Sequence, residues 1–436
     1  MKALAALLVL AATAPAQQLT GKWTTDIDTF GTPTSWNLTL QQKGDEVTGE
    51  LGGDKLQGTL KGGKLQFHAK DPGGDGYEDV TATLSGDKLT GTLVWAQNAS
   101  VSHPTTHTFT ATRNVTAAAN KTAPQTHEFT PTVFRRQFSS QYDPVLTINP
   151  GDTIHTTTVD AGGYDLTGTP RSLGGNPQTG PFYVTGAAPG DTLAIHIRHL
   201  KLNRDWAIST NGVVPRANNP ELAALSQNKV DQVRWHLDLA NGTASPEKPG
   251  PHMAKYSVPV KPMLGCVAVA TDAGGPAPRS GDSGGFGGNM DFNEITDGAT
   301  VLLPVRVPGA LLYFGDGHAV QGDGETTGDA LETSLDVTVT VEVLHHRVPG
   351  PMVETDTHIM AVGLDGSIDT ALSSATATMG QYLQKEYSLT PQEFAMVLGT
   401  AAEYKVSEAA DRNAGVVLKM AKSKLNTLTA PTSQQH

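Results

Sequence analysis

Short units made of a glycine-containing turn and an alternating strand recur along the first part of the chain. They read GDEVTGEL at 44–51, GDKLQGTL at 53–60, GGKLQFHA at 62–69 and GDKLTGTL at 86–93. Apolar and polar residues alternate within each unit, which is the period of a strand with one buried face. Repeated turns at this short spacing are typical of an antiparallel meander. The pattern predicts a small antiparallel β module over residues 17–115.

The turn-strand device returns in the second part of the chain with different turn residues. Pro-Gly-Asp turns precede β-branched runs at 148–160 and 187–200, and a glycine turn precedes another at 295–318. Asp and Gly favour turns, and β-branched residues favour strands. Because strands and helices do not alternate, we expect a β-sandwich or jelly-roll-like domain at 126–436 rather than a Rossmann sheet. A small, polar, alanine-rich stretch at 116–125 predicts the linker between the two parts.

Helical periodicity gathers near the end of the chain, apart from one short candidate at 220–227. Apolar residues recur at helical spacing from Ser367 to Glu386. A capping-box pattern at Thr390 predicts a second helix that runs to about Tyr404. A returning strand is expected within 411–425. The predicted fold is therefore mainly β with α+β elements and C-terminal helices.

Composition restricts the classes of function. The chain has 47 Gly and 27 Pro without a collagen period, which is typical of a turn-rich β protein. The net charge of −12 and the lack of a basic patch argue against a nucleic-acid partner. Cys266 is the single cysteine, so no intramolecular disulfide can form. It is either a nucleophile or, as the surrounding LGCVAVA favours, a small buried hydrophobic residue.

The first residues have the pattern of a targeting signal. Lys2 precedes a short apolar run over Ala3 to Ala12, and Ala14-Pro15-Ala16 fits a small-x-small cleavage site. The run is too short to span a bilayer, and no later stretch is long and apolar enough to do so. We therefore expect a signal peptide at 1–16 and an exported protein, periplasmic or extracellular, without a membrane span.

Residues able to carry chemistry concentrate between Pro308 and Glu332. An apolar strand over Ala310 to Phe314 is predicted to run into a glycine-rich loop. The polar residues of that loop are Asp316, His318, Gln321, Asp323 and Glu325. Carboxylates and an imidazole can ligate a metal ion or act as a general base. A solvated acidic surface loop would have the same composition, and these residues alone leave both interpretations open.

Four segments, taken in order, carry a family resemblance. They are GPFYVTGAAPGDTL at 180–193, PMLGCVAVA at 262–270, GGNMDFNEITDGATVLLPVRVPGALLYFGDGHAVQGDGE at 287–325, and ALET at 330–333. Together they resemble the acetamidase/formamidase family of amidohydrolases, which release ammonia from small linear amides. The GNMD and GDGHxxQGDGE elements are the most specific. The resemblance covers roughly Thr126 to Leu425 and implies a mostly β fold, a small amide substrate and a homo-oligomer.

The resemblance also implies that the matching polar residues line one site. The expected ligands of a divalent cation, Zn or Ca, are Asp160, Asp291, Asp316 and His318. The expected catalytic residues are Glu325, His318 and Asp323, and the expected substrate-binding residues are Asn289 and Gln321. The cation would acidify water and polarise the amide carbonyl, and Glu325 would act as the base that returns a proton to ammonia. No organic cofactor is expected.

Two questions stay open at this point. The N-terminal module resembles, in its turn pattern, lipocalin- or β-barrel-like modules of exported bacterial enzymes. Trp23, Trp36 and Trp95 could stack on a sugar there, although core or barrel-closing roles are favoured. The alternative to an amidase is a non-catalytic exported ligand-binding protein that uses the same acidic pocket.

Overall fold

The structure is a computed structural model. It describes residues 19–71, 73–96, 100, 104–113, 123–226, 230–272 and 276–429. The chain divides into two compact units, unit 1 at 1–115 and unit 2 at 116–436. The predicted signal peptide and residues 116–122 of the predicted linker lie outside the described residues. Of the helices described, none combines the length and apolar composition that crossing a bilayer requires.

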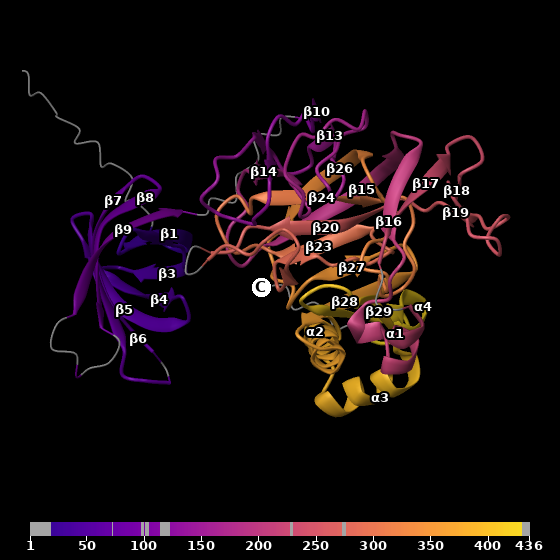
Figure 1. The fold of residues 1–436 in the computed structure, drawn as a ribbon. Helices are drawn as coiled ribbons and strands as arrows, with labels where there is room; N and C mark the ends of the chain where they lie inside the picture. The colour runs from indigo at the N-terminus through magenta and orange to yellow at the C-terminus, as the bar shows by residue number, and fades with distance from the viewer. Residues whose placement is uncertain are drawn as a thin grey trace, which may run out of the picture. The chain divides into compact units, whose positions relative to one another are not determined.

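Unit 1 is an antiparallel sheet, here called sheet 1, that closes on itself (Figure 1). Successive strands from β3 to β9 pair with one another, β3 pairs with β1, and β9 returns to pair with β1. The strands are β1 (Gly21–Thr29), β2 (Thr32–Thr34), β3 (Asn37–Lys43), β4 (Glu46–Leu51), β5 (Asp54–Lys61), β6 (Lys64–Lys70), β7 (Tyr77–Ser85), β8 (Lys88–Ala96) and β9 (Thr105–Arg113). The predicted small antiparallel module is confirmed.

The alternation seen in the sequence decides which side chains fill sheet 1. On β7, Val80, Ala82 and Leu84 are buried, whereas Thr81 and Thr83 between them are exposed. The inward side chains form one apolar cluster that includes Trp23 and Phe109. Burying each large apolar side chain contributes roughly 1.5–3 kcal/mol, so this alternation drives the sheet to close around its own core.

Unit 2 contains two further sheets. Sheet 2 consists, in spatial order, of β10 (Thr126–Glu128), β13 (Thr153–Thr157), β26 (Leu335–Leu344), β15 (Thr192–Leu202), β23 (Thr300–Pro304), β27 (Met352–Glu354), β28 (His358–Asp365), β30 (Ala414–Ala421) and β29 (Glu403–Glu408). The main path of sheet 3 consists of β19 (Val258–Pro259), β18 (Thr243–Pro246), β17 (Gln232–Asp238), β16 (Trp206–Thr210), β25 (Glu332–Thr333), β24 (Leu312–His318), β20 (Met263–Val269), β22 (Gly287–Asn289) and β21 (Ser283–Gly284). Beside β24 lies β14 (Gln178–Val184), which pairs with β11 (Phe134–Arg135) and β12 (Leu146–Ile148).

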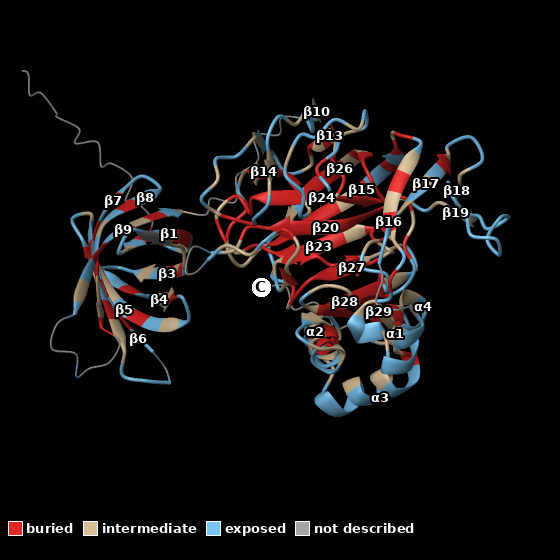
Figure 2. Ribbon diagram, viewed as in Figure 1, coloured by how far each residue is buried: buried red, intermediate tan, exposed pale blue. Residues whose placement is uncertain are grey.

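The main core of unit 2 lies between sheets 2 and 3. Ile195 and Val337 contribute from sheet 2, and Val267 and Phe314 contribute from sheet 3. Figure 2 shows the buried residues running along β15, β20, β23 and β24. Both faces of β20 are buried, which explains why its sequence MLGCVAV does not alternate. The β-sandwich prediction is confirmed, and Cys266 is one of the buried residues.

Helix α2 (Ile368–Tyr387) covers part of sheet 2, and α3 (Pro391–Ala401) packs against α2. The short helices α1 (Pro220–Ser226) and α4 (Lys422–Leu425) also belong to unit 2. Ser367 and Thr390 each form a capping box at the start of a helix. Met379 and Leu383 of α2 pack against β28 and β30. The second helix ends earlier than predicted because the chain has to leave it to enter β29.

The predicted strand at 310–314 differs from the observed one. Strand β24 starts at Leu312 and continues to His318, so Asp316 and His318 lie within the sheet and not in the loop. Gly315 and Gly317 obscured this extension in the sequence. Both glycines face neighbours that leave no room for a side chain, since a Cβ on Gly317 would lie 2.7 Å from Leu335 Cγ.

Candidate active site

Adjacent strands of sheet 3 bring the central polar residues together. Asp316 and His318 are two residues apart on β24, so their side chains project from the same face. His318 pairs in register with Glu332 on β25. On the other side of β24, the pairing with β20 places Gly265 beside Asp316.

The last residue of β22 and the turn after it add two more polar side chains. Asn289 pairs with Cys266 on β20, and the backbone N–H of Asp291 donates to the carbonyl of Gly265 at 3.1 Å. The Asn289 amide then donates to Asp291 Oδ2 at 2.7 Å and to Asp411 Oδ2 at 2.6 Å. This asparagine therefore holds two carboxylates from distant parts of the sequence in one place.

The loop after β24 closes the site with further carboxylates. Glu325 is buried, and its Oε1 accepts a hydrogen bond from the Ala330 N–H at 2.9 Å. Gly324 forms a parallel bridge with Glu408, and the Ala409 N–H donates to the Gly324 carbonyl at 2.9 Å. Glu408, at the end of β29, is fully buried. This backbone pairing places the end of β29, in sheet 2, beside the loop that follows β24 of sheet 3.

Gln321 sets the orientation of His318. The Gln321 amide nitrogen donates to the carbonyls of Asp291 at 2.5 Å and Ser407 at 3.4 Å, so its Oε1 faces His318 Nδ1 at 2.8 Å. Only a protonated Nδ1 can donate to that oxygen, which turns Nε2 towards the acidic groups. Nε2 lies 3.1 Å from Glu332 Oε1, as in an ion pair, but the two atoms do not have the geometry of a hydrogen bond.

Several buried atoms in this cluster lack hydrogen-bond partners. They are Asp291 Oδ1, Asp316 Oδ1, His318 Nε2, Glu332 Oε2 and Glu408 Oε2. A buried polar atom left without a partner costs about 1–3 kcal/mol, so their convergence indicates that a ligand completes the site. Three overlapping groups have ligand atoms within 4.8 Å of one another, namely Asp291/His318/Glu325, Asp316/His318/Glu332 and Asp291/Glu408/Asp411.

Burial and mutual repulsion favour protonated carboxyl groups here. Burial, followed by the charges of Glu325 and Glu408, raises the pKa of Asp291 well above its usual range. Burial likewise raises the pKa of Glu325 well above its usual range and that of Glu332 to about 8. Burial opposes a charge on His318, but Glu332 and Asp316 raise the pKa of its imidazole well above the ordinary value. A cation in the site would oppose the shifts of the carboxyl groups.

The backbone at the site is strained. Asp291, Asp316 and Glu325 have φ values of 42°, 58° and 45°, in the left-handed region that costs a non-glycine residue on the order of 1–3 kcal/mol. Gly265 leaves the space into which these side chains turn, since a Cβ there would lie 2.4 Å from Asp291 Oδ1 and 2.7 Å from Asp316 Oδ2. Such outliers persist where the surrounding structure holds a functional geometry.

The structure does not bring all the predicted residues into this cluster. Asp160 is buried but forms an ion pair with Arg204 at 2.7 Å and accepts from the Tyr164 N–H at 2.9 Å, so it lies outside the candidate cation groups. Asp323 is exposed and lies 3.0 Å from Lys405 Nζ. The GDGHxxQGDGE motif does not reveal the exposed position of Asp323. Only the path of the loop turns Asp323 outwards and Glu325 inwards.

Other residues of the site were missed by the sequence analysis. Glu332, Glu408 and Asp411 are candidate ligands, and the Asn176 amide donates to Asn289 Oδ1 at 3.0 Å and Asp316 Oδ2 at 3.1 Å. Glu332 falls in the ALET segment, which could have pointed to it. Glu408 and Asp411 stand beside small residues in a turn, and no local pattern predicts that this turn reaches the loop after β24.

A cavity of about 710 Å³ borders the cluster. Glu332 and Asn176 line it on the side of the cluster, and Tyr164 and Trp206 contribute aromatic surface. The volume lies within the range of about 300–1,000 Å³ typical of small-molecule sites. An organic molecule in this cavity would therefore lie next to the buried acids.

Comparison with known proteins shows which family the region of this site resembles. The Acetamidase/Formamidase family model matches residues 271–411, a range that includes Asp291, Asp316, His318, Glu325 and Glu408. The crystal structure of an acetamidase from Bacillus halodurans is 28% identical and has a TM-score of 0.60, covering 69% of this chain and 99% of that one. Over these residues the chain is similar to the acetamidase/formamidase family.

Two further relatives agree with this assignment. An acetamidase from Yersinia enterocolitica is 26% identical with a TM-score of 0.60, covering 69% of this chain and 93% of that structure. A candidate formamidase from Schizosaccharomyces pombe is 27% identical over 218 residues, which are 39% of this chain. That alignment spans 52% of the yeast protein, about half its length. The family resemblance seen in the sequence is thus confirmed.

Proposed function

We propose that unit 2 hydrolyses the C–N bond of small linear amides, releasing a carboxylate and ammonia, and that the protein is exported. The buried group of Asp291, His318 and Glu325, with unpartnered atoms next to a cavity, carries the proposal. Similarity to the acetamidase/formamidase family supports amide hydrolysis as the reaction. Export rests on the sequence pattern of residues 1–16.

The donor set fits a divalent cation. Two of the three candidate groups contain His318, whose imidazole is a nitrogen ligand that zinc accepts and calcium does not favour. A metal-bound histidine usually donates its other ring N–H to a second hydrogen-bond partner, which fixes the orientation of the ring. Gln321 is such a partner for His318 Nδ1. We propose that Asp316, His318 and Glu332 would hold it, which leaves Glu325 for proton transfer, and that it would supply Lewis acidity and a more acidic water.

The protein groups can supply the proton transfers of hydrolysis. Water adds to the amide carbon, and Glu325 takes its proton; the C–N bond then breaks, and the nitrogen leaves with that proton as ammonia. Burial raises the pKa of Glu325, which makes its carboxylate a stronger proton acceptor for the first of these steps. Asn289 and Gln321 keep their neighbours in place, because their amides already bond to protein groups.

Ammonia release is the direct test of the proposal. The purified full-length protein would be assayed with formamide, acetamide and propionamide before and after exhaustive chelation, with bound metal measured in the same sample. We expect release that chelation abolishes and zinc restores. Release that survives chelation with no metal present would keep the amidase and discard the cation.

A wider panel of amides tests whether the cavity accepts substrates larger than formamide. A volume of about 710 Å³ exceeds what formamide needs, so longer aliphatic and aromatic primary amides belong in the same assay. Binding of these amides without ammonia release from any of them would overturn the proposal in favour of the non-catalytic ligand-binding protein.

A further inference from the structure

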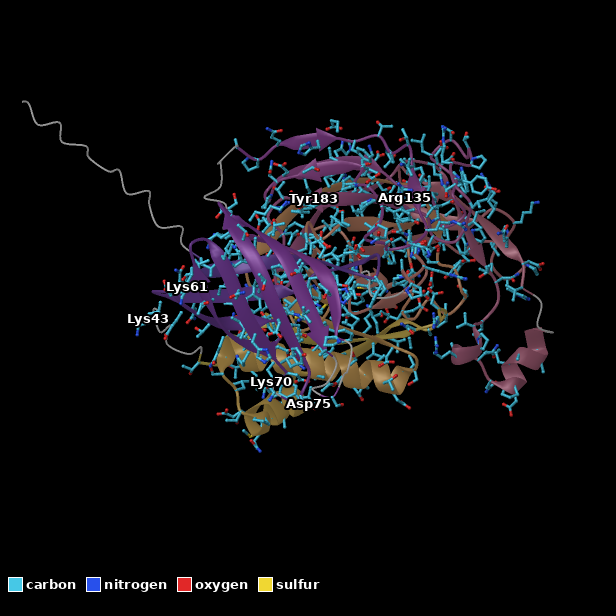
Figure 3. All side chains as sticks on the ribbon, turned by 90° about the vertical axis from the view of Figure 1, so that its left-hand side faces the viewer. Lys43, Lys61, Lys70, Asp75, Arg135 and Tyr183 are labelled. Atoms are coloured by element: carbon cyan, nitrogen blue, oxygen red, sulfur yellow. The ribbon has the colours of Figure 1, made fainter. Side chains whose placement is uncertain are left out.

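Unit 1 holds a second cavity, separate from the amidase site. It has a volume of about 380 Å³, and all of its lining residues belong to sheet 1 or its turns. They come from one end of the sheet, where β1 and β8 end and β5, β7 and β9 begin. Figure 3 shows Lys70 and Asp75 near this end of the strands and Lys43 and Lys61 at the other.

The two ends of sheet 1 are filled differently. Inward positions near the Lys43 end carry leucines, including Leu60, Leu65 and Leu84, all of them buried. At the cavity end, the inward alternation continues but places polar side chains at Asp54, Glu78 and His107. An inward carboxylate adds neither strand pairing nor apolar packing. The cavity end of sheet 1 therefore differs chemically from the leucine-filled end.

Glu78 is the central observation. It occupies the inward position next to Val80 on β7, with 5% of its surface exposed, and its Oε2 has no hydrogen-bond partner. Burial, and then the charge of Asp54, raise the pKa of Glu78 to about 7. The Oε2 atom of Glu78 is thus buried at the cavity without a hydrogen-bond donor, which a ligand in the cavity would supply.

The lining defines the class of ligand. Neither lysine nor arginine lines the cavity, so the described residues offer an anion no cationic partner. Trp36 and Trp95 are partly buried there, and indole faces attract cations as well as apolar groups. His107 is already engaged, with its ring nitrogens at 2.7 Å from Thr105 Oγ1 and 3.2 Å from the Asp28 carbonyl.

We propose that this end of sheet 1 binds a small organic ammonium compound, with its N–H groups on Glu78 and Asp54 and its apolar part between Trp36 and Trp95. Charge-assisted hydrogen bonds from an ammonium group to a carboxylate are shorter and stronger than neutral ones. The volume of about 380 Å³ is large enough for an aryl-alkyl amine. Unit 1 would then bring the enzyme a ligand that is not its amide substrate.

Phenethylammonium is the probe that tests this site. Calorimetric titration of the full-length protein, with tryptophan fluorescence recorded in parallel, should show saturable binding at one site. Phenethyl alcohol has the same apolar part without the charge, and phenylacetate has the opposite charge, so both should bind at least roughly 10-fold more weakly.

Matched variants locate the binding. Glu78→Gln should weaken phenethylammonium binding by roughly 10- to 100-fold, the usual range for loss of a hydrogen bond to a charged group. Asp79→Asn removes a carboxylate from the next, outward-facing position and should leave the affinity unchanged. Trp95→Phe keeps an aromatic ring and tests the cavity if Glu78→Gln fails to fold, since it should weaken binding and alter the fluorescence response.

The proposal has clear contrary outcomes. Absence of saturable phenethylammonium binding, equal binding of the alcohol, or equal loss of affinity in the Asp79 variant would each overturn it. Ammonia release from amides should be the same in all three variants, because the cavity lies wholly in unit 1. The result is therefore independent of the amidase assignment.

Discussion

The two units of this protein both bury carboxylates inside β-sheets, but the backbone does so in different ways. In unit 1, Glu78 sits at a regular inward position of β7, where the strand alternation continues undisturbed. In unit 2, Asp291, Asp316 and Glu325 reach the cluster from left-handed backbone conformations. A regular strand can present a side chain to a cavity, whereas convergence of several acids on one point requires local strain that the surrounding packing must hold.

The largest expected effect separates the inward and outward acids of the loop in unit 2. Glu325→Gln removes the proposed base and should lower the rate of ammonia release by roughly 10²–10⁴. Asp323→Asn changes an exposed residue two positions earlier and should leave the rate within about twofold. Circular dichroism and unfolding curves check that both variants fold. Wild-type turnover by Glu325→Gln would remove it from the mechanism.

The second prediction concerns the space on which the strained cluster depends. Gly265→Ala places a methyl group 2.4 Å from Asp291 Oδ1, so the carboxylates must move apart. We expect at least about a 10²-fold loss of ammonia release, the scale of a misplacement of about 1 Å at a reacting centre. Gly281→Ala, where a Cβ would meet nothing within 4 Å, is the control and should retain activity. A fully active Gly265→Ala enzyme would contradict the assigned centre.

A third prediction compares ion pairs in the two units by stability. Arg204 and Asp160 in unit 2 are both nearly inaccessible and lie 2.7 Å apart. Arg204→Met leaves a buried carboxylate without its partner and should lower the free energy of unfolding by about 3–5 kcal/mol. Lys55→Met breaks the exposed pair with Glu50 in unit 1 and should cost at most about 1 kcal/mol. Denaturant titrations of the two variants measure both values.

The smallest expected effect is the pH dependence contributed by Glu78. Its folded pKa of about 7 exceeds the ordinary 4.5, so folding favours the neutral form. This contribution to stability is fully present below pH 4.5 and is lost as the pH rises through about 7, a change of roughly 3 kcal/mol at most. The free energy of unfolding of unit 1 should therefore decrease less between pH 5 and pH 8 in Glu78→Gln than in wild type. Identical pH profiles for the two proteins would show that Glu78 is not buried as described.

The sequence predicts the structure of unit 1 in more detail than that of unit 2, and the reason is physical. In unit 1, partners are adjacent hairpins, so turn residues and alternation determine both the strands and their inward faces. In unit 2, Glu408 meets Glu325 through pairing between segments about 80 residues apart, which no local pattern encodes. Motif resemblance recovered Asp291, Asp316, His318 and Glu325, but it also included Asp323, whose direction depends on the loop.

Closure of sheet 1 also imposes an order on its folding. Strand β1 is synthesised first, yet one of its partners, β9, lies about 80 to 90 residues later, with Asp28 opposite Thr108 and Trp23 opposite Arg113. The strands from β3 to β9 can pair successively as hairpins, but the seam between β1 and β9 has to wait until the last strand of the unit is available. Substitutions along this seam should therefore slow the final folding step more than substitutions in the inner hairpins. The same delay postpones formation of the Glu78 cavity, which Ile27 and His107 close from the two sides of the seam.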